Sequence, residues 1–490
     1  YDSVPLVCFT GQVPIGLIGN TSFQEVDIVN ITESICKYAV MVHNREELAE
    51  TIRKAFYIAR TGKPGVVVVD LPKDIQKEYG SDSYSKKREV RDCDVSAVTQ
   101  MGQISKALEV LNQAKKPLFL VGGGVNIAHA NREMTQLAEK TGVPVVTTIM
   151  GKGGIPSTHE LYVGNLGIHG SFAANSAVSH CDVLFSIGTR FSDRITGKTE
   201  EFAKNATIIH MDIDPSSISR DVVVNISVAA DAKEVMNLLL KHTISLQVTE
   251  WLEKIRQWKK EYPLVMDNVG MSPQKIMQAI NETFPKAVIS TDVGQNQMWA
   301  AQFLELDENK KLLTSGGMGT MGYGFPAAIG AKLGNPEKDV LVLTGDGGMQ
   351  MNIQEMATAV AYELPIVICI LNNGYLGNVR QWQEMFYERC YSSTCMRYRK
   401  SCPVPCDFSG KDCPEYTPDF VKLAESYGAK GIRVMNEKEI VNALTYGRKN
   451  KKVPTVIEFI IEAECNVMPI VPLGNSLEEM ILENKGNCRG

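Results

Sequence analysis

Residues 341–352, LVLTGDGGMQMN, place one acid between glycines at the end of an apolar run. A second apolar run, PIVICILNN, covers residues 365–373 and ends with two consecutive asparagines. Such β-branched runs, bounded by turn residues, predict buried parallel strands. Ligands of these sheets bind outside the carboxyl ends of the strands. We therefore expect Asp346, Asn372 and Asn373 to face a ligand.

The residue types at these two strand ends suit a magnesium-bound diphosphate. Carboxylate and amide oxygens are ligands that Mg²⁺ accepts together with phosphate oxygens and water. Glycines at 345, 347 and 348 would let backbone N–H groups approach a phosphate, and a helix expected from about Ile353 would present its positive end. Gly-Asp-Gly and Asn-Gly are each common in ordinary turns, so the prediction depends on their occurring together.

The composition indicates a globular protein of several domains. The chain has 490 residues, of which 44% are hydrophobic and 22% charged, which excludes a disordered or fibrous class. A net charge of −5 argues against a nucleic-acid surface. No apolar run approaches the ~18 residues of a membrane span. Twelve cysteines are too dilute for a disulfide scaffold, so we expect a reducing, cytoplasmic compartment.

Three α/β blocks follow one another along the chain, and each predicts a doubly wound parallel sheet. Residues 1–78 form the first block, which opens directly on a strand; we therefore expect it to be an incomplete domain, with the chain starting inside it. A polar linker covers 79–95 and the second block 96–245. A linker helix with two tryptophans lies within 246–271, and the third block covers 272–490.

Gly-Asp-Gly followed by Asn-Asn resembles the motif of thiamine-diphosphate enzymes. More specific segments surround it: GQVP, FQEVDIV, LPKD, GTRFSDRITGK, DVGQNQMWAAQF, GTMGYGFPAAIGA and NNGYLGNVRQWQ. Together they resemble the acetolactate synthase (acetohydroxyacid synthase) catalytic-subunit family from Tyr1 to about Leu482. The resemblance implies decarboxylation of pyruvate on thiamine diphosphate. The hydroxyethyl carbanion then attacks pyruvate or 2-oxobutyrate, in the biosynthesis of valine and isoleucine.

The resemblance also implies the cofactor residues of the third block. The side chains of Asp346 and Asn373 and the backbone carbonyl of Tyr375 would bind Mg²⁺. Met321 would support the bent cofactor, although a core position is the commoner use of methionine. Asn296 stands where the family often has histidine, and we expect its amide to donate to phosphate. Thiamine diphosphate would contact Val293, Gly294, Gln295, Asn296, Gly319, Met321, Gly345, Gly347 and Gly348.

The substrate residues implied by the resemblance come from all three blocks. Phe23, Gln24 and Lys73 match positions that line the substrate channel. Arg194 would pair with the acceptor carboxylate, although an arginine after a strand is more often a surface ion pair. Trp382 would shape acceptor choice, and otherwise suggests packing. The family's catalytic glutamate would lie upstream of this chain, and a second chain would normally supply it, which implies a homodimer or dimer of dimers.

The second block resembles the family's FAD domain, in which FAD is retained without net redox turnover. The tail, CNVMPIVPLGNSLEEMI, resembles a C-terminal lid that closes over the active site and excludes water. A separate small regulatory subunit is the family's source of feedback. The FAD contacts would be Phe23, Gly122, Gly123, Gly124, Thr148, Ile149, Met150, Leu166, Gly167, Ile168, His169, Gly188, Arg190, Asp212, Ile213 and Asp231.

A cysteine-rich insert covers residues 390–413 and exceeds the commonest family pattern. Cys395, Cys402, Cys406 and Cys413 allow three interpretations: a four-thiolate zinc site, free or redox-active thiols, or disulfides. Their spacing lacks the paired knuckles typical of strong zinc motifs.

Two other functions compete with acetolactate synthesis. One is a related thiamine-diphosphate and FAD carboligase or pyruvate oxidase, in which FAD takes electrons. The other is a non-catalytic nucleotide-binding or regulatory protein on the same scaffold. The joint presence of Asp346, Asn373 and Met321 argues for an active enzyme.

Overall fold

The structure, a computed structural model, describes residues 1–80, 101–264, 271–402, 418–463 and 465–483. The chain divides into two compact units. The first comprises residues 1–99 with 213–215, and the second comprises residues 100–212 with 216–490. The second unit contains two six-stranded sheets, and the first unit contains a three-stranded one. The division into three domains stays a prediction.

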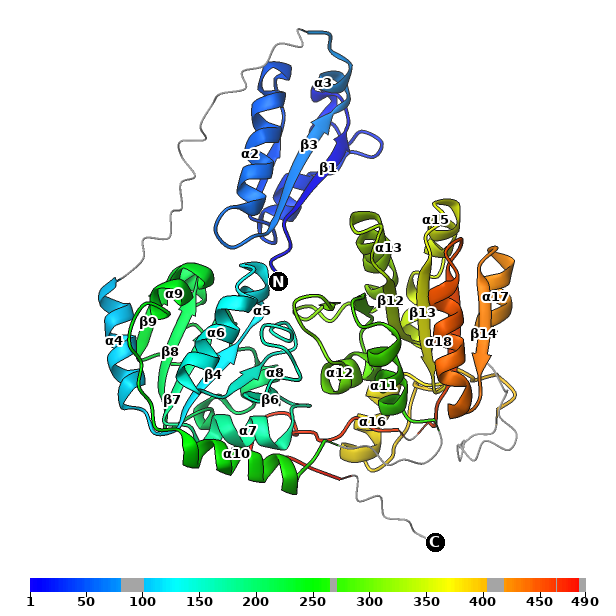
Figure 1. Ribbon diagram of the computed structural model, residues 1–490. Helices are drawn as coiled ribbons and strands as arrows, with labels where there is room; N and C mark the ends of the chain where they lie inside the picture. The colour runs from blue at the N-terminus through cyan, green and yellow to red at the C-terminus, as the bar shows by residue number, and fades with distance from the viewer. Residues whose placement is uncertain (81–100, 265–270, 403–417, 464, 484–490) are drawn as a thin grey trace. The chain divides into compact units, whose positions relative to one another are not determined.

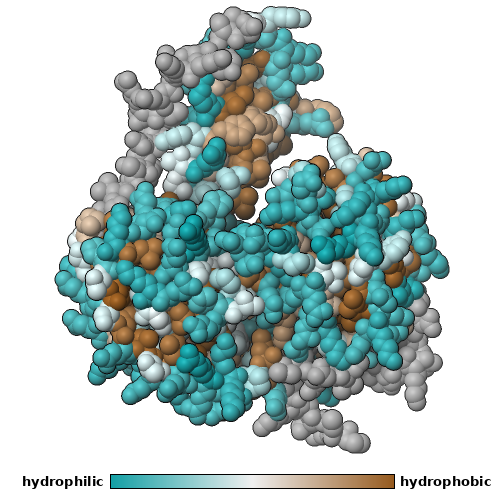
Figure 2. Space-filling view, in the orientation of Figure 1, coloured by the Kyte–Doolittle hydropathy of each residue, from teal (hydrophilic) through white to brown (hydrophobic). Residues whose placement is uncertain are grey.

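The first unit is a small parallel sheet of order β1-β3-β2. Its buried residues include Val67 and Val69 of the sheet and Ala55 and Ala59 of α2. Figure 2 shows hydrophobic surface on this unit. Phe9 of β1 is one of its exposed large apolar side chains. Its elements are β1 (Leu6–Gln12), α1 (Ile28–Glu33), β2 (Tyr38–Met41), α2 (Leu48–Arg60), β3 (Val66–Pro72) and α3 (Lys73–Lys77).

The central sheet of the second unit has the order β6-β5-β4-β7-β8-β9, and its strand pairs are parallel. The order reverses beside β4, as in a doubly wound fold. Its strands are β4 (Pro117–Val121), β5 (Val145–Thr147), β6 (Tyr162–Asn165), β7 (Val183–Ile187), β8 (Thr207–Asp212) and β9 (Ile226–Ala229).

Helices cover both faces of the central sheet (Figure 1). One face packs against α4 (Met101–Gln113), α5 (Gly123–Ile127), α6 (Asn131–Thr141) and α9 (Ala232–Leu239). The other packs against α7 (Phe172–His180), the short α8 (Asp193–Thr196) and α10 (Thr249–Glu261), whose Trp251 and Trp258 are buried. The sequence predicted α10 as a linker helix, whereas its tryptophans belong to this core.

The C-terminal sheet has the order β11-β10-β12-β13-β15-β14, and it is also parallel. The three parallel sheets confirm the predicted α/β class. The chain runs from β10 outward to β11 on one side, and from β12 outward to β13 on the other. Its strands are β10 (Val288–Thr291), β11 (Lys311–Leu313), β12 (Val340–Gly345), β13 (Ile366–Asn372), β14 (Lys430–Val434) and β15 (Thr455–Ile460).

Helices also cover both faces of the C-terminal sheet (Figure 1). One face packs against α11 (Pro273–Thr283), α12 (Gln295–Phe303) and α18 (Ile440–Lys449). The other packs against α13 (Gly324–Gly334), α14 (Asp346–Met351), α15 (Glu355–Ala361) and α17 (Phe420–Ser426), and α16 (Gly377–Phe386) follows β13. Within the described residues, no helix is both long enough and apolar enough to cross a bilayer.

The C-terminal tail packs into both cores of the second unit. Val467 belongs to one core of the C-terminal sheet, and Val471 and Leu477 belong to a core of the central sheet. Val471 N–H donates to the carbonyl of Ile168 at 2.8 Å. The tail therefore links the two sheets here, and its closure over an active site stays a prediction.

A buried lysine joins the central layer to helix α12. Lys152 Nζ donates to the carbonyl of Ala301 at 2.7 Å, and Asn165 Nδ2 donates to the same oxygen at 2.6 Å. A cation near the last carbonyls of a helix is favourable. Burial nevertheless dominates and lowers the pKa of Lys152 to about 7, while the charge of Glu305 opposes this shift.

Replacing Lys152 with methionine should remove a pH dependence of stability. The folded protein releases the Lys152 proton near pH 7, whereas the unfolded chain keeps it up to the ordinary pKa of 10.5. The unfolded state thus binds more protons in this window, so wild-type stability should rise with pH relative to Lys152→Met. The expected slope is up to about 1.4 kcal/mol per pH unit. Urea unfolding across this range measures it, and parallel stability curves would contradict it.

Candidate active site

Three neighbouring strands of the C-terminal sheet end at the candidate site. Strands β10, β12 and β13 lie side by side, and Gly345 pairs with Leu371 at the ends of β12 and β13. Asp346 directly follows β12 and Asn372 is the last residue of β13, so the two begin the site from adjacent positions. The helix predicted from about Ile353 is present as α15, which begins at Glu355. A separate short helix that the sequence did not predict, α14, begins at Asp346 with Gly345 as its N-cap.

Asp346 is a buried carboxylate with one oxygen unsatisfied. Its side chain is 2% exposed, and Oδ2 has no hydrogen-bond partner. Burial raises its pKa to about 7, although N–H groups of Gly347, Asp346 and Gly374 favour the charged form. Since Gly374 follows Asn373, the two predicted segments meet here. A buried, unpaired carboxylate oxygen is costly unless a cation meets it, so Asp346 fits a metal ion.

Asn373 and Tyr375 complete a compact oxygen-bearing turn. Asn373 Oδ1 accepts the N–H of Tyr375 at 3.0 Å, and this oxygen keeps a second lone pair for a cation. Asn373 Nδ2 donates to Gln295 Oε1 at 3.2 Å, and this bond fixes the orientation of the amide and therefore of its Oδ1. Among the described residues, no three His, Cys, Asp or Glu side chains are grouped to hold a metal. One carboxylate with amide and carbonyl oxygens is a donor set suited to Mg²⁺.

The predicted diphosphate residues lie at the start of α12. Gly294 precedes the helix with a φ of 132°, which favours glycine, and Gln295 and Asn296 form its first turn. Helix N-termini bind anionic groups through free N–H groups and the helix dipole. The expected donation from Asn296 to phosphate is wrong as a side-chain contact. Its two N–H bonds go to the carbonyls of Asp292 and Leu343, at 2.9 and 3.0 Å.

Asp292 was missed by the sequence analysis, and it fixes the loop that carries Gly319 and Met321. Its carboxylate is buried and accepts the N–H groups of Gly322 and Gly324, at distances of 2.9–3.0 Å. Met321 itself is 36% exposed, so it is available to a ligand and is no core methionine. The loop conformation therefore depends on a carboxylate placed directly after β10.

The glycines after Asp346 are needed for close packing. A Cβ on Gly348 would lie 2.5 Å from Asp292 Oδ1, and one on Gly347 would lie 2.8 Å from Leu376 Cδ2. A Cβ on Gly345 would meet only Asn296 Oδ1, at 3.9 Å, and the carbonyl of Leu371 at 4.0 Å. The glycines at 347 and 348 thus bring α14 against its neighbours.

Alanine at Gly348 should destabilise the protein, whereas alanine at Gly345 should be tolerated. The Gly348→Ala methyl must displace the Asp292 carboxylate, and such overpacking costs about 1–3 kcal/mol. In Gly345→Ala the new methyl lies at an ordinary van der Waals distance from its neighbours, so this variant serves as the matched control. Its free energy of unfolding should change by no more than about 1 kcal/mol. Chemical unfolding without cofactors measures both. Equal stabilities of the two variants would contradict this packing.

The predicted FAD residues of the second unit lie at one edge of the central sheet. Because the strands are parallel, the residues that follow their carboxyl ends share that edge. Gly122, Gly123 and Gly124 follow β4; Thr148, Ile149 and Met150 follow β5; Leu166, Gly167, Ile168 and His169 follow β6; Gly188 and Arg190 follow β7; Asp212 ends β8; and Asp231 follows β9. Ile213 comes next after Asp212 and is grouped with the first unit.

Part of this pattern has a structural cause that is independent of a ligand. A Cβ on Gly122 would lie 2.2 Å from the carbonyl oxygen of Gly188, and one on Gly124 would lie 2.7 Å from Gly188 Cα. Asp231 Oδ1 caps helix α9 by accepting the N–H groups of Lys233 and Glu234. Burial lowers the pKa of His169 to about 4, and its Nδ1 lies 3.1 Å from the carbonyl of Pro469.

The predicted substrate residues occupy varied surroundings. Arg194 lies in α8 with a side chain 62% exposed, and its Nε is 3.9 Å from Asp193 Oδ2. Trp382 of α16 is half-buried and packs edge-on against Phe386. In the first unit, Phe23 is 88% exposed, and Gln24 has a φ of 63°, a conformation unfavourable for a residue with a side chain. Lys73, also exposed, begins α3.

The start of the cysteine-rich insert pairs with the turn at residues 373–375. Leu376 N–H donates to Thr394 O at 2.8 Å and Met396 N–H donates to Gly374 O at 2.9 Å, which forms an antiparallel bridge between Tyr375 and Cys395. Cys395 and Cys402 are free thiols. Cys406 and Cys413 lie outside the described residues, so the choice among zinc, thiols and disulfides stays open.

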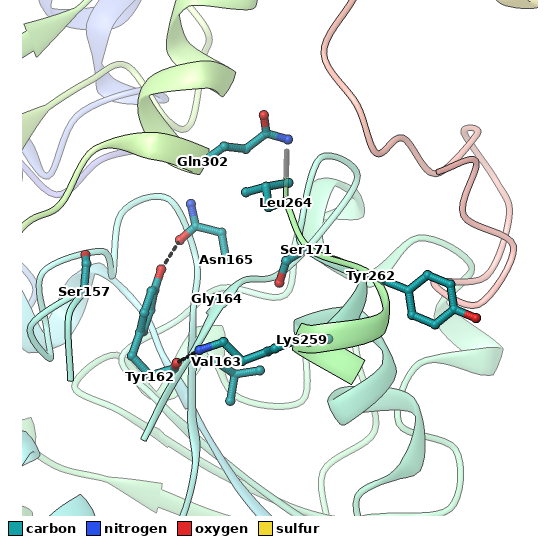
Figure 3. Close-up of a pocket in the computed structure, with 11 residues that line it drawn as sticks. Ser157, Tyr162, Val163, Gly164, Asn165, Ser171, Lys259, Tyr262, Leu264 and Gln302 are labelled. Atoms are coloured by element: carbon teal, nitrogen blue, oxygen red, sulfur yellow. Dashed lines mark hydrogen bonds between the residues drawn. The ribbon is translucent and has the colours of Figure 1, made fainter. Parts of the chain in front are cut away.

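A separate cavity of about 210 Å³ lies beside the central sheet and contains none of the predicted site residues. Several of its polar side chains already bond to protein groups (Figure 3): Tyr162 OH donates to Asn165 Oδ1 at 3.1 Å, and Lys259 Nζ donates to the carbonyl of Tyr162 at 3.0 Å. The cavity gives no indication of a ligand, and the candidate site remains at the ends of β10, β12 and β13.

Comparison with known protein families agrees with this placement. Residues 292–459 match the family described as "Thiamine pyrophosphate enzyme, C-terminal TPP binding domain". Residues 104–239 match "Thiamine pyrophosphate enzyme, central domain". The first match begins at Asp292 and includes Asp346 and Asn373, so it covers the edge where the three strands end.

Curated relatives are similar along nearly the whole chain. The acetolactate synthase large subunit of Corynebacterium glutamicum is 40% identical over 484 residues, which cover 97% of this chain and 75% of that protein. The probable acetolactate synthase large subunit of Methanocaldococcus jannaschii is 42% identical over 495 residues, covering 98% and 80%. The acetolactate synthase isozyme 3 large subunit of Escherichia coli is 37% identical over 497 residues, covering 98% and 83%.

Proposed function

The chain belongs to the acetolactate synthase large-subunit family of thiamine-diphosphate enzymes, and from this premise we propose how its residues hold the cofactor and substrates. The family activity is a transferase reaction. It decarboxylates pyruvate and condenses the two-carbon unit with a second 2-oxo acid, pyruvate or 2-oxobutyrate, in branched-chain amino-acid biosynthesis. The observation that carries the site assignment is the unsatisfied, buried Asp346 oxygen beside the Asn373 turn.

Asp346, Asn373 and the Tyr375 carbonyl would hold Mg²⁺, which would supply positive charge for a diphosphate. Backbone N–H groups at the start of α12 and α14 would meet the phosphate oxygens. Met321, presented on the loop that Asp292 fixes, would support the cofactor's bent form. When bound, thiamine diphosphate supplies an electron sink for the carbanion chemistry.

Further assignments rest on the family resemblance and the placement of the residues. FAD would bind at the carboxyl edge of the central sheet, with a structural role. The relatives are named large subunits, and from this we infer a small regulatory partner. A homodimeric or dimer-of-dimers assembly is proposed on the family resemblance alone. The free thiols at eight described cysteines are consistent with a reducing cytoplasmic location.

Acetolactate formation tests the proposed function. The protein expressed from its complete coding sequence, with thiamine diphosphate, Mg²⁺ and FAD, should convert pyruvate to acetolactate without oxygen uptake. Acetate or acetyl phosphate with oxygen consumption would instead identify a pyruvate oxidase. No conversion of pyruvate, in protein that binds thiamine diphosphate, would favour a non-catalytic role.

Asp346→Asn should abolish metal-dependent cofactor binding. Loss of the carboxylate removes the formal charge that the cation meets, and affinity for Mg²⁺ should fall by at least about 100-fold. Asp339→Asn is the matched control, because Asp339 precedes the other end of β12 and pairs with Arg448 and Lys451 at the surface. Calorimetric titration of Mg²⁺ with thiamine diphosphate measures both variants. Equal affinities would contradict the metal assignment.

Arg194→Gln should raise the KM for pyruvate by about tenfold or more, because a charge-assisted hydrogen bond contributes about 1.5–3 kcal/mol. Arg194→Lys should recover part of the loss, since it retains the charge without the bidentate geometry. Steady-state kinetics under saturating cofactor measures this. An unchanged KM in Arg194→Gln would show that another group meets the carboxylate.

A further inference from the structure

A buried acid lies behind the turn at residues 372–375, here called the metal turn because it holds two of the proposed Mg²⁺ ligands. Neither the Gly-Asp-Gly and Asn-Asn motif nor the proposed function uses this acid. Glu458 is the one charged residue of strand β15, TVIEFI, and its side chain is 0% exposed. Strand β15 lies between β13 and β14, and Glu458 pairs in register with Ile370 and Arg433. A charged side chain in the middle of a buried strand requires specific partners.

Both oxygens of Glu458 are engaged, and each points in a different direction. Oε2 accepts Arg433 Nε at 2.7 Å, and Oε1 accepts Asn372 Nδ2 at 2.7 Å. Arg433 also donates to Asp419 Oδ1 at 2.8 Å, which leads toward the surface. The bond to Asn372 leads toward the candidate metal site. Glu458 is thus the point where a surface ion pair is linked to the metal turn.

The side chain of Asn372 also bonds to the backbone of the 372–375 turn. Its Oδ1 accepts Gly374 N–H at 2.9 Å, while the bond from its Nδ2 to Glu458 orients the amide for this contact. Gly374 has a φ of 73°, and its N–H also favours the charged form of Asp346. The turn residues on either side of Gly374 are Asn373 and Tyr375, the proposed oxygen donors.

We propose that Glu458 is a positioning residue for the metal site. Through Asn372 it holds the 372–375 turn in the conformation that presents Asn373 Oδ1 and the Tyr375 carbonyl to Mg²⁺, and its negative charge favours a divalent cation there. The proposal rests on the proposed function, because it assumes that Mg²⁺ binds with thiamine diphosphate at Asp346. Partners of this kind, behind the direct ligands, commonly control metal affinity.

A purely structural role is the alternative to positioning. In that case Glu458 and Arg433 would only join β14 to β15, and changes at either would alter stability without changing metal affinity. Asp419 provides the matched control. It contacts Arg433 and caps α17 through Lys422 N–H, yet it makes no contact with Asn372 among the hydrogen bonds of the described residues.

The test compares Glu458→Gln, Glu458→Leu and Asp419→Asn. Glu458→Gln retains an oxygen that can accept from Asn372 but loses the charge, and Glu458→Leu loses both. The half-saturating Mg²⁺ concentration at fixed thiamine diphosphate should rise by about tenfold in Glu458→Gln and by more in Glu458→Leu. Asp419→Asn should weaken the ion pair with Arg433 while asparagine still caps α17, and it should keep the wild-type Mg²⁺ affinity. Titration calorimetry gives the affinities, and urea unfolding without cofactors gives the stabilities.

Wild-type Mg²⁺ affinity in folded Glu458→Gln would overturn the proposal, as would an equal loss of affinity in Asp419→Asn. If Glu458→Leu fails to fold, the near-isosteric Glu458→Gln decides alone. A wild-type protein that binds no Mg²⁺ with thiamine diphosphate would overturn the proposed function as well, so the two failures are distinguishable.

Discussion

The structure of the site depends on one constraint: Asp346 is a carboxylate buried at the end of a parallel strand, with an oxygen that no protein group satisfies. Removing such a group from water is expensive, and the rise of its pKa to about 7 expresses that cost. Backbone N–H groups of Gly347 and Gly374 offset part of it. A divalent cation would offset the rest and would return Asp346 to its charged form.

The surrounding loops are fixed by other buried polar side chains, each of which has partners. Asp292 is satisfied by backbone N–H groups, and Glu458 is satisfied by Arg433 and Asn372. Gln295, which accepts a hydrogen bond from Asn373, donates to Gln381 Oε1 at 3.0 Å. Gln381 Oε1 also accepts Val467 N–H at 2.8 Å, so hydrogen bonds connect Asn373 to the C-terminal tail. Satisfied networks of this kind set one conformation, and Asp346 is the carboxylate at these strand ends with an oxygen that has no partner.

The sequence was sufficient for the features that periodicity and strand-end chemistry determine. The apolar runs ending at Gly345 and Asn372 predicted two neighbouring strands and the meeting of Asp346 with the asparagine turn. Short strands such as β6, β9 and β11 carry too little pattern to be recognised. Helix α14 was not predicted because Gly-Asp-Gly-Gly has low helix propensity, and the dense packing of Gly348 against Asp292 overrides it. Asn296 shows a further limit, since only coordinates reveal that backbone carbonyls already use its amide hydrogens. Glu458 could have been found, because an acid inside an apolar strand signals a buried partner.

The most direct measurement is the position of a bound metal. A crystal of the protein grown with thiamine diphosphate and Mn²⁺ in place of Mg²⁺ would locate the ion by anomalous scattering. We predict a peak at about 2.1 Å, the magnesium–oxygen distance, from Asp346 Oδ2, Asn373 Oδ1 and the Tyr375 carbonyl. A protein that binds the cofactor while its metal peak lies away from these three oxygens would contradict it.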